Sequence, residues 1–151
     1  MTVKAGILGC GYYVPEKIMT NIDLEKIVDT TDEWIRTRTG IEARRIAAPG
    51  ECTSDMAHKA ALKAIENAGI SKEEIDLIIL PTICPDYAWP ATACITASKL
   101  GFNDVPAFDI SAACSGFIYG LTIARAMVES GLYKRVLLVA AEKFSTYLDW
   151  T

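Results

Sequence analysis

The sequence predicts a layered α/β fold in which helices cover a largely parallel sheet. Residues 77–80 (LIIL) and 135–141 (RVLLVAA) are almost entirely aliphatic, which is typical of strands buried on both faces. Helical patterns alternate with these strand-like runs, and the alternation indicates parallel strands joined by helical crossovers. With 151 residues the chain can bury one good core, and its length suggests a single domain.

The first element is expected to be a strand over residues 3–10 (VKAGILGC), which runs into a glycine turn. That turn is not a dinucleotide-binding fingerprint, because no third glycine follows to open a helix. Asn21 is a good N-cap for a short helix over 22–28. Thr31 caps a second short helix, and Gly40 ends it, since glycine readily adopts the left-handed conformation at a helix C-terminus.

Three longer helices are expected in the rest of the chain. They cover approximately residues 55–68, 91–100 and 115–130, and each is followed by a glycine. Thr53 or Ser54 caps the first of them, whose alanines recur at spacings of three and four along one face. A further strand is expected at 107–110, directly before the last helix.

The composition argues against several classes of protein. The chain carries 15 basic and 19 acidic residues, for a net charge of -4, and it has no basic block that would indicate nucleic-acid binding. No run of 18 apolar residues is present, so we expect no transmembrane span. A single histidine and the absence of a CxxC pair argue against a metal site. An odd number of cysteines without a secretory signal indicates reduced thiols in a cytoplasmic protein.

Cys114 is the candidate catalytic residue. It stands where the strand at 107–110 gives way to the last helix, among small residues that leave room for a substrate. Backbone N–H groups at the start of a helix favour the thiolate form of a nearby thiol, and the thiolate is the nucleophile in covalent catalysis. The alternative is an inert cysteine packed in the core, because free cysteine is among the most buried residue types. This pattern alone leaves both interpretations open.

Trp34 and Arg38 form a second candidate site. They stand one turn apart on the predicted short helix after Thr31, so they share a face. Such a pair could hold a planar ring by stacking and cation–π contact. Alternatively, the tryptophan anchors the helix to the body of the protein and the arginine covers its ring. The pairs Arg36-Arg38 and Arg44-Arg45 suit a phosphate-bearing ligand or a solvated face.

Two longer motifs carry a family resemblance. The stronger is 30–41 (TTDEWIRTRTGI), and the second is 107–116 (AFDISAACSG). Supporting matches occur at 21–25 (NIDLE), 46–49 (IAAP) and 89–91 (WPA), all in colinear order. Together these segments resemble β-ketoacyl-acyl-carrier-protein synthase III, the condensing acyltransferase that initiates bacterial fatty acid synthesis.

The resemblance implies a thiolase-like α/β fold with layered α-β-α-β-α architecture and two similar halves, of which residues 1–151 match the amino-terminal one. It implies that Cys114 takes the acyl group from acyl-CoA as a thioester. Trp34 and Arg38 then hold the adenine of coenzyme A, with Thr30 beside them. The residue at the Trp89 position reaches across a homodimer interface into the partner's acyl pocket. Because tryptophan is bulky, we expect a short pocket that favours acetyl or similar primers.

The reaction implied by the resemblance has two steps. After acyl transfer, malonyl-acyl carrier protein loses carbon dioxide and its carbanion attacks the thioester, which requires donors that stabilise the enolate. In the family these donors are a histidine and an asparagine in the carboxy-terminal half, beyond Thr151. We therefore expect a truncated or split chain that is inactive in condensation without that half. A hydrophobic content of 51% fits a surface covered by the missing half or a partner subunit. Acyl-CoA is a substrate here, so no cofactor is expected.

Two alternatives to this function stay open. One is a related thiolase-fold synthase with another product, such as a hydroxymethylglutaryl-CoA synthase or a synthase of secondary metabolism. The other is a non-catalytic homologue that keeps the fold for dimerisation or ligand binding. The motif containing Trp34 and Arg38 favours the initiating synthase.

Overall fold

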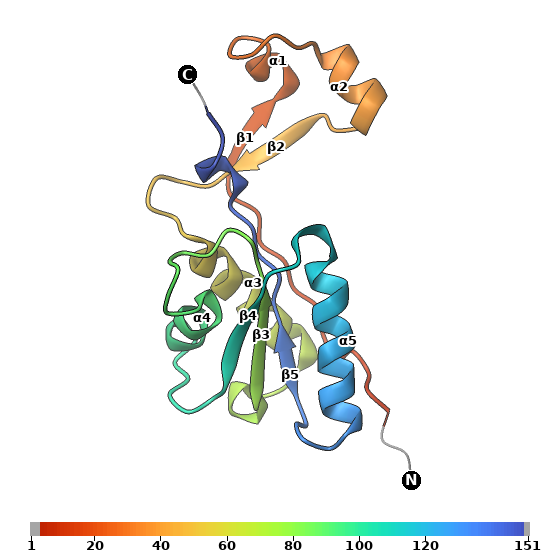
Figure 1. The fold of residues 1–151 in the computed structure, drawn as a ribbon, viewed down its shortest axis with the longest axis vertical. Helices are drawn as coiled ribbons and strands as arrows, with labels where there is room; N and C mark the ends of the chain where they lie inside the picture. Colours follow the sequence, from red (N-terminus) through yellow and green to blue (C-terminus); the bar gives the residue numbers. More distant parts are fainter. Residues whose placement is uncertain (1–3, 150–151) are drawn as a thin grey trace. The chain divides into compact units, whose positions relative to one another are not determined.

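The computed structural model describes residues 4–149, which form two compact units (Figure 1). The larger unit contains residues 4–13 and 52–142, and the smaller contains residues 14–51 and 143–149. No helix within the described residues is long and apolar enough to cross a membrane.

The larger unit is built on a three-stranded parallel sheet. Strand β3 (Leu77–Pro81) lies in the centre, between β4 (Ala107–Ile110) and β5 (Val136–Leu138). In the register, Ile78 stands beside Ala107 on one side and Leu137 on the other. Every residue of β3 is buried, which confirms the strand predicted from the aliphatic run.

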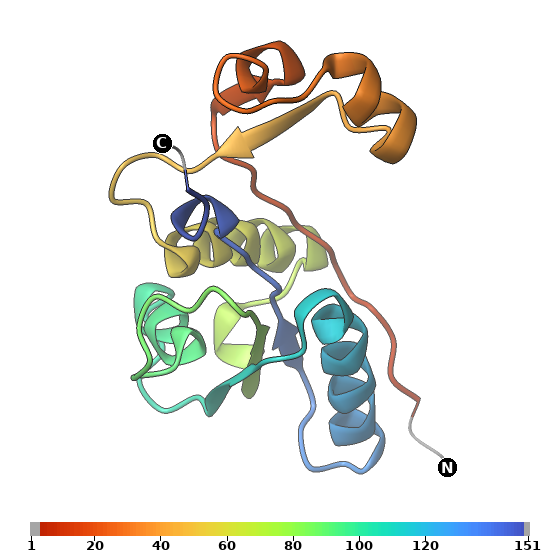
Figure 2. The ribbon, with the colours of Figure 1, turned by 45° about the horizontal axis from the view of Figure 1, so that its top comes forward.

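Helices cover both faces of this sheet. On one face lie α3 (Thr53–Ala68) and α4 (Thr92–Lys99), and on the other lies α5 (Gly116–Glu129) (Figure 2). Alternate residues of β3 face the two layers. Ile78 and Leu80 belong to a core with alanines of α3 and α4, whereas Leu77 and Ile79 pack with Ala124 of α5. The predicted α/β class with a parallel sheet is therefore confirmed.

The boundaries of the three longer helices lie within two residues of those expected from the sequence. The short helix expected over 22–28 is shorter than predicted, because α1 (Asn21–Leu24) ends at Leu24. Helix α3 starts at Thr53 itself, so its N-cap is Cys52 rather than Thr53 or Ser54, and it ends at Gly69 with φ 63°. Residues 4–149 also contain three short 3-10 helices: η1 (Lys72–Glu74), η2 (Ala113–Ser115) and η3 (Phe144–Thr146).

The strand expected at residues 3–10 is wrong for the part that the structure describes. Residues 4–13 have no regular secondary structure and instead run along α3. A Cβ on Gly9 would lie 2.4 Å from the backbone nitrogen of Ala68, and one on Gly11 would lie 2.3 Å from that of Ala64. The two glycines thus allow backbone to lie directly against a helix. Because a strand exists only through hydrogen bonds to a neighbour, an apolar segment without such a neighbour is not one.

The smaller unit contains an antiparallel pair, β1 (Lys17–Thr20) and β2 (Ala43–Ile46), in which Lys17 stands opposite Ile46. Helices α1 (Asn21–Leu24) and α2 (Asp32–Thr39) lie between the two strands in the sequence. The expected capping of α2 is confirmed, since the Thr31 side chain accepts the backbone N–H of Trp34 at 3.1 Å and Gly40 ends the helix with φ 71°.

Candidate active site

Cys114 is exposed and lies in η2, between the end of β4 and the start of α5. The carboxyl end of β4 leads into this turn, and the carboxyl edge of an open parallel sheet is where α/β proteins bind their ligands. Helix α5 has 14 residues and begins at Gly116, so its N-terminal amides lie close to Cys114 in the chain. Within the described residues the Cys114 side chain is exposed rather than packed in a core, and its role as the nucleophile stays a prediction.

The residue before Cys114 has an unusual backbone. Ala113 has φ 46° and is the one non-glycine residue of the described chain in the left-handed region. That conformation costs about 1–2 kcal/mol for a residue with a side chain. It persists where surrounding structure holds it, and such positions concentrate at functional sites. Here the Ser115 amide donates to the Ala112 carbonyl at 3.1 Å and closes the turn around Cys114.

Helix α5 starts in close contact with the sheet. A Cβ on Gly116 would lie 2.9 Å from Cβ of Pro81, and one on Gly120 would lie 2.6 Å from Cδ1 of Leu138. Both distances are shorter than ordinary contacts between carbon atoms, which are about 3.5–4.0 Å. The two glycines therefore let the first turns of α5 lie on the ends of β3 and β5, and this fixes where the helix begins relative to Cys114.

The loop between β3 and α4 presents two exposed aromatic side chains. Tyr87 is 64% exposed and Trp89 is 80% exposed, on a segment that includes a cis Trp89-Pro90 bond. The loop is nevertheless held at several points. Its hydrogen bonds run from Thr53 Oγ1 to the Cys84 carbonyl (2.6 Å), from the Ser54 amide to Asp86 Oδ1 (3.0 Å) and from the Asp86 amide to Thr92 Oγ1 (3.1 Å). The Trp89 side chain is thus exposed to solvent on a loop that hydrogen bonds hold in place.

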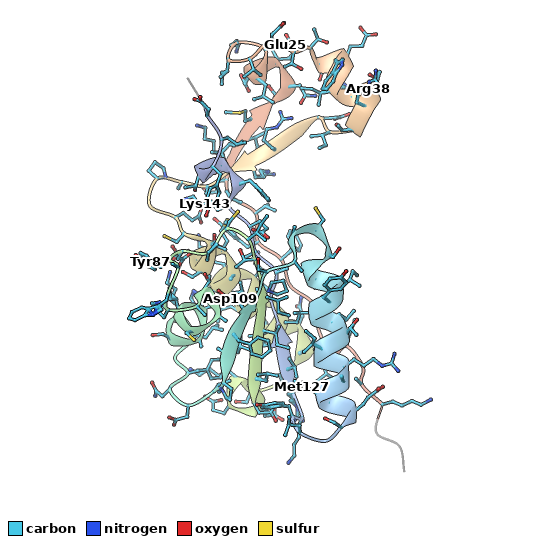
Figure 3. The ribbon with its side chains drawn as sticks, in the orientation of Figure 1. Glu25, Arg38, Tyr87, Asp109, Met127 and Lys143 are labelled. Carbon is cyan, nitrogen blue, oxygen red and sulfur yellow. The ribbon has the colours of Figure 1, made fainter. Side chains whose placement is uncertain are left out.

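The carboxylates of Asp109 and Glu142, which the sequence analysis did not identify, hold loop and helix segments near the carboxyl ends of the parallel strands. Asp109 accepts the backbone N–H groups of Thr92 at 2.8 Å and Ala93 at 2.7 Å, at the start of α4 (Figure 3). Glu142, which follows β5, accepts the backbone N–H of Ile83 at 3.0 Å. Both contacts join residues distant in the sequence, so no local pattern could have indicated them.

Trp34 and Arg38 lie on α2 in the smaller unit, one turn apart, as the spacing predicted (Figure 3 labels Arg38). Both are exposed, Trp34 by 57%, while Ile35 supplies the buried side of the helix. The tryptophan ring is thus more than half exposed, and among the described residues no cation–π contact joins it to Arg38. Thr30, two positions before α2, is half-buried.

The four arginines of this unit differ in what they bind. Arg36 pairs with Glu42 at 2.9 Å, Arg44 donates to Asn21 Oδ1 at 2.8 Å, and Arg45 donates to the Pro15 carbonyl at 3.0 Å. Arg38 alone among them forms no hydrogen bond or ion pair with a described residue. It is therefore the guanidinium that remains available to a ligand.

A buried asparagine connects the segments that carry α2. Asn21 is 1% exposed, and its Nδ2 donates to Asp32 Oδ1 and to the Ile41 carbonyl, both at 2.8 Å. Its Oδ1 accepts from Arg44 of β2. The expectation that Asn21 is an N-cap is wrong, because the Thr20 side chain caps α1. Asn21 instead ties both ends of α2 to the strand pair.

The site residues named from the sequence therefore divide between the units. Cys114 and Trp89 belong to the larger one, and Thr30, Trp34 and Arg38 to the smaller. Residues 4–149 contain no group of three or more side chains suited to hold a metal ion.

A family model for 3-oxoacyl-[acyl-carrier-protein (ACP)] synthase III matches residues 108–151, which include Cys114. Over 150 residues the chain is 60% identical to the β-ketoacyl-[acyl-carrier-protein] synthase III of Sulfurovum sp. (strain NBC37-1), covering 99% of this chain and 44% of that protein. The enzyme of the same name from Caldanaerobacter subterraneus subsp. tengcongensis is 55% identical over 148 residues, covering 98% and 45%. The chain corresponds to the amino-terminal portion of β-ketoacyl-[acyl-carrier-protein] synthase III.

Solved structures agree with this assignment. The crystal structure of 3-oxoacyl-[acyl-carrier-protein] synthase III from Aquifex aeolicus VF5 matches with a TM-score of 0.92 and 54% identity, over 95% of this chain and 46% of that one. The chain thus has the thiolase-like α/β fold that the sequence resemblance implied. It spans slightly less than half the length of the curated relatives it matches.

Proposed function

We propose that this chain carries the acyl-accepting part of a condensing enzyme that initiates fatty acid synthesis. The thiolate of Cys114 attacks the thioester carbonyl of an acyl-CoA, the bond from that carbonyl to the coenzyme A sulfur breaks, and the acyl group remains on Cys114. Coenzyme A leaves as its thiol after taking up a proton. The single observation that carries this proposal is that Cys114 is exposed just before α5, directly after Ala113, whose backbone is in the left-handed conformation.

The nucleotide end of the substrate is assigned to α2. Trp34 offers an exposed ring for stacking on adenine, and Arg38 offers a guanidinium with no internal partner. Thr30 stands beside the start of the same helix. Three other arginines of the unit are occupied by internal contacts, which favours Arg38 over them as the ligand-binding cation.

The second step is the attack of a decarboxylated malonyl-acyl carrier protein on the acyl-Cys114 thioester. It requires donors for the developing enolate. We assign these donors to the carboxy-terminal half of the fold, since this chain spans less than half of its relatives. On this account the chain alone does not catalyse condensation. As a bacterial fatty-acid enzyme it belongs in the cytoplasm.

We further propose that the protein acts as a homodimer in which Trp89 enters the partner's acyl pocket. Support comes from the 80% exposure of Trp89 on its anchored loop. Helix α5 also exposes Phe117, Ile118 and Tyr119, an apolar surface that a partner or the second half of the fold would cover. A tryptophan fills much of a small pocket, so short primers such as acetyl are favoured.

The proposal is tested by incubating the full-length protein with acetyl-CoA and measuring its intact mass. It predicts one acetyl group per chain, lost in Cys114→Ala. A protein that takes up no acetyl group, or one that Cys114→Ala does not affect, would leave a non-catalytic role as the better account.

A further inference from the structure

We propose that Asp109 is a positioning residue for Cys114: it fixes the end of β4, and thereby the turn that aims the nucleophile. This inference rests on the proposed function for its kinetic test. No contact between Asp109 and the reacting atoms is required. The residue acts through the backbone that leads from β4 into η2.

Asp109 forms two charge-assisted hydrogen bonds, which are stronger than hydrogen bonds between neutral groups. Its two carboxylate oxygens accept the amides of Thr92 (2.8 Å) and Ala93 (2.7 Å), one oxygen for each amide. Hydrogen bonds from backbone N–H to a carboxylate are shorter and stronger than neutral ones. The negative charge also faces the first turn of α4, where the helix dipole stabilises it. Two bonds to adjacent amides fix the orientation as well as the distance.

The end of β4 is thereby held on both sides. Asp109 ties it to α4, and the carbonyl of the next residue, Ile110, accepts the Thr82 amide that follows β3 at 3.0 Å. Beyond Ile110 the chain reaches the left-handed Ala113 and then Cys114. A turn in an unfavourable backbone conformation keeps its geometry only while its ends are fixed. Releasing Asp109 therefore lets this turn relax and moves the thiol.

The molecule supplies a matched control. Asp76, just before β3, accepts two consecutive backbone amides in the same way, from Lys134 at 2.7 Å and Arg135 at 2.9 Å. These contacts lie at the amino ends of β3 and β5, whereas Cys114 follows the carboxyl end of β4. Asp76→Asn thus removes a comparable carboxylate clamp from the opposite edge of the same sheet.

The experiment compares Asp109→Asn and Asp76→Asn in single-turnover acylation of the full-length protein by acetyl-CoA. A displacement of about 1 Å at a reacting group can cost up to about 100-fold in rate. We expect the saturating rate to fall at least about tenfold in Asp109→Asn and to change less than about twofold in Asp76→Asn. The half-saturating acetyl-CoA concentration should stay constant, because nucleotide binding is assigned to the smaller unit. Equal rate losses in both variants would overturn the proposal.

Two further measurements keep the outcome decisive. If Asp109→Asn does not fold, Asp109→Glu keeps the charge and lengthens the side chain. If Asp109 positions Cys114, Asp109→Glu should be acylated more slowly at near-normal thermal stability, and a wild-type rate would contradict this role.

Alkylation of Cys114 by iodoacetamide needs no acyl-CoA. It therefore tests the positioning role of Asp109 separately from the proposed acyl transfer. If wild-type protein takes no acetyl group, the proposed function fails, while an Asp109-dependent alkylation rate still supports positioning and an unchanged rate refutes it.

Discussion

A Cβ atom on Gly116 would lie 2.9 Å from Cβ of Pro81, so the first residue of α5 rests directly on the last residue of β3. This contact places the N-terminus of a 14-residue helix beside the turn that carries Cys114. The glycine is required here by space, since its backbone lies in the ordinary helical region with φ -56°.

Gly116→Ala should push the start of α5 away from the sheet. We expect a loss of about 1–3 kcal/mol in the free energy of unfolding, as for overpacking in a core. The rate of Cys114 acylation should fall with it, because the helix amides move relative to the thiol. Gly6→Ala is the control, since a Cβ there meets nothing within 4 Å. Normal acylation by Gly116→Ala would show that this contact does not position the nucleophile.

Trp34→Ala and Arg38→Ala should each weaken the binding of coenzyme A. A cation–π or stacking contact contributes about 0.5–2 kcal/mol, which corresponds to roughly 2- to 30-fold in affinity. Titration calorimetry with coenzyme A measures the change. Arg36→Ala is the matched control, because Arg36 lies on the same helix but pairs with Glu42. An equal loss of affinity in Arg36→Ala would point to general electrostatic attraction instead.

Asn21→Ala should destabilise the smaller unit and weaken coenzyme A binding indirectly. The substitution leaves Asp32, Arg44 and the Ile41 carbonyl each without one partner. A buried polar group left unsatisfied costs about 1–3 kcal/mol. Urea denaturation followed by circular dichroism gives the change. Asn103→Ala, at an exposed turn, should stay within about 0.5 kcal/mol of wild type. If both variants unfold alike, Asn21 does not have the connecting role assigned to it.

Trp89→Ala should broaden the choice of acyl chain. Removing the indole enlarges the proposed pocket, so the rate with longer straight-chain acyl-CoA should rise relative to acetyl-CoA. The comparison requires initial rates with a series of chain lengths. Tyr87→Ala, exposed on the same loop, should leave the preference unchanged. Comparable turnover of long and short chains by the wild type would already refute a short pocket.

The parts of the fold that the sequence predicted are those specified by local pattern. The strand at 107–110 and the burial of β3 follow from short apolar runs, and Gly40 and Gly69 end their helices as expected. The strand pair β1 and β2 was missed. Its sequences, KIMT and ARRI, carry no alternating apolar pattern, and their pairing joins residues such as Lys17 and Ile46 across two helices.

In the candidate site too, features set by local sequence could be predicted and features set by distant contacts could not. Cys114 and the shared face of Trp34 and Arg38 could be read from local sequence, since helix starts and turns are local features. The roles of Asp109 and Asn21 could not, because both depend on partners from other elements. The left-handed Ala113 was also unforeseen, as alanine gives no sign of such a conformation.

The most direct test of Cys114 as the acyl-accepting nucleophile is to identify the residue that acetyl-CoA acetylates. The full-length protein is incubated with acetyl-CoA, digested, and its peptides are analysed by mass spectrometry, beside Cys114→Ala and the exposed-cysteine control Cys94→Ala. The account predicts a hydroxylamine-sensitive acetyl group on Cys114, absent in Cys114→Ala and retained in Cys94→Ala. An acetyl group elsewhere, or none in the wild type, would contradict the assignment of Cys114 as the acyl-accepting nucleophile.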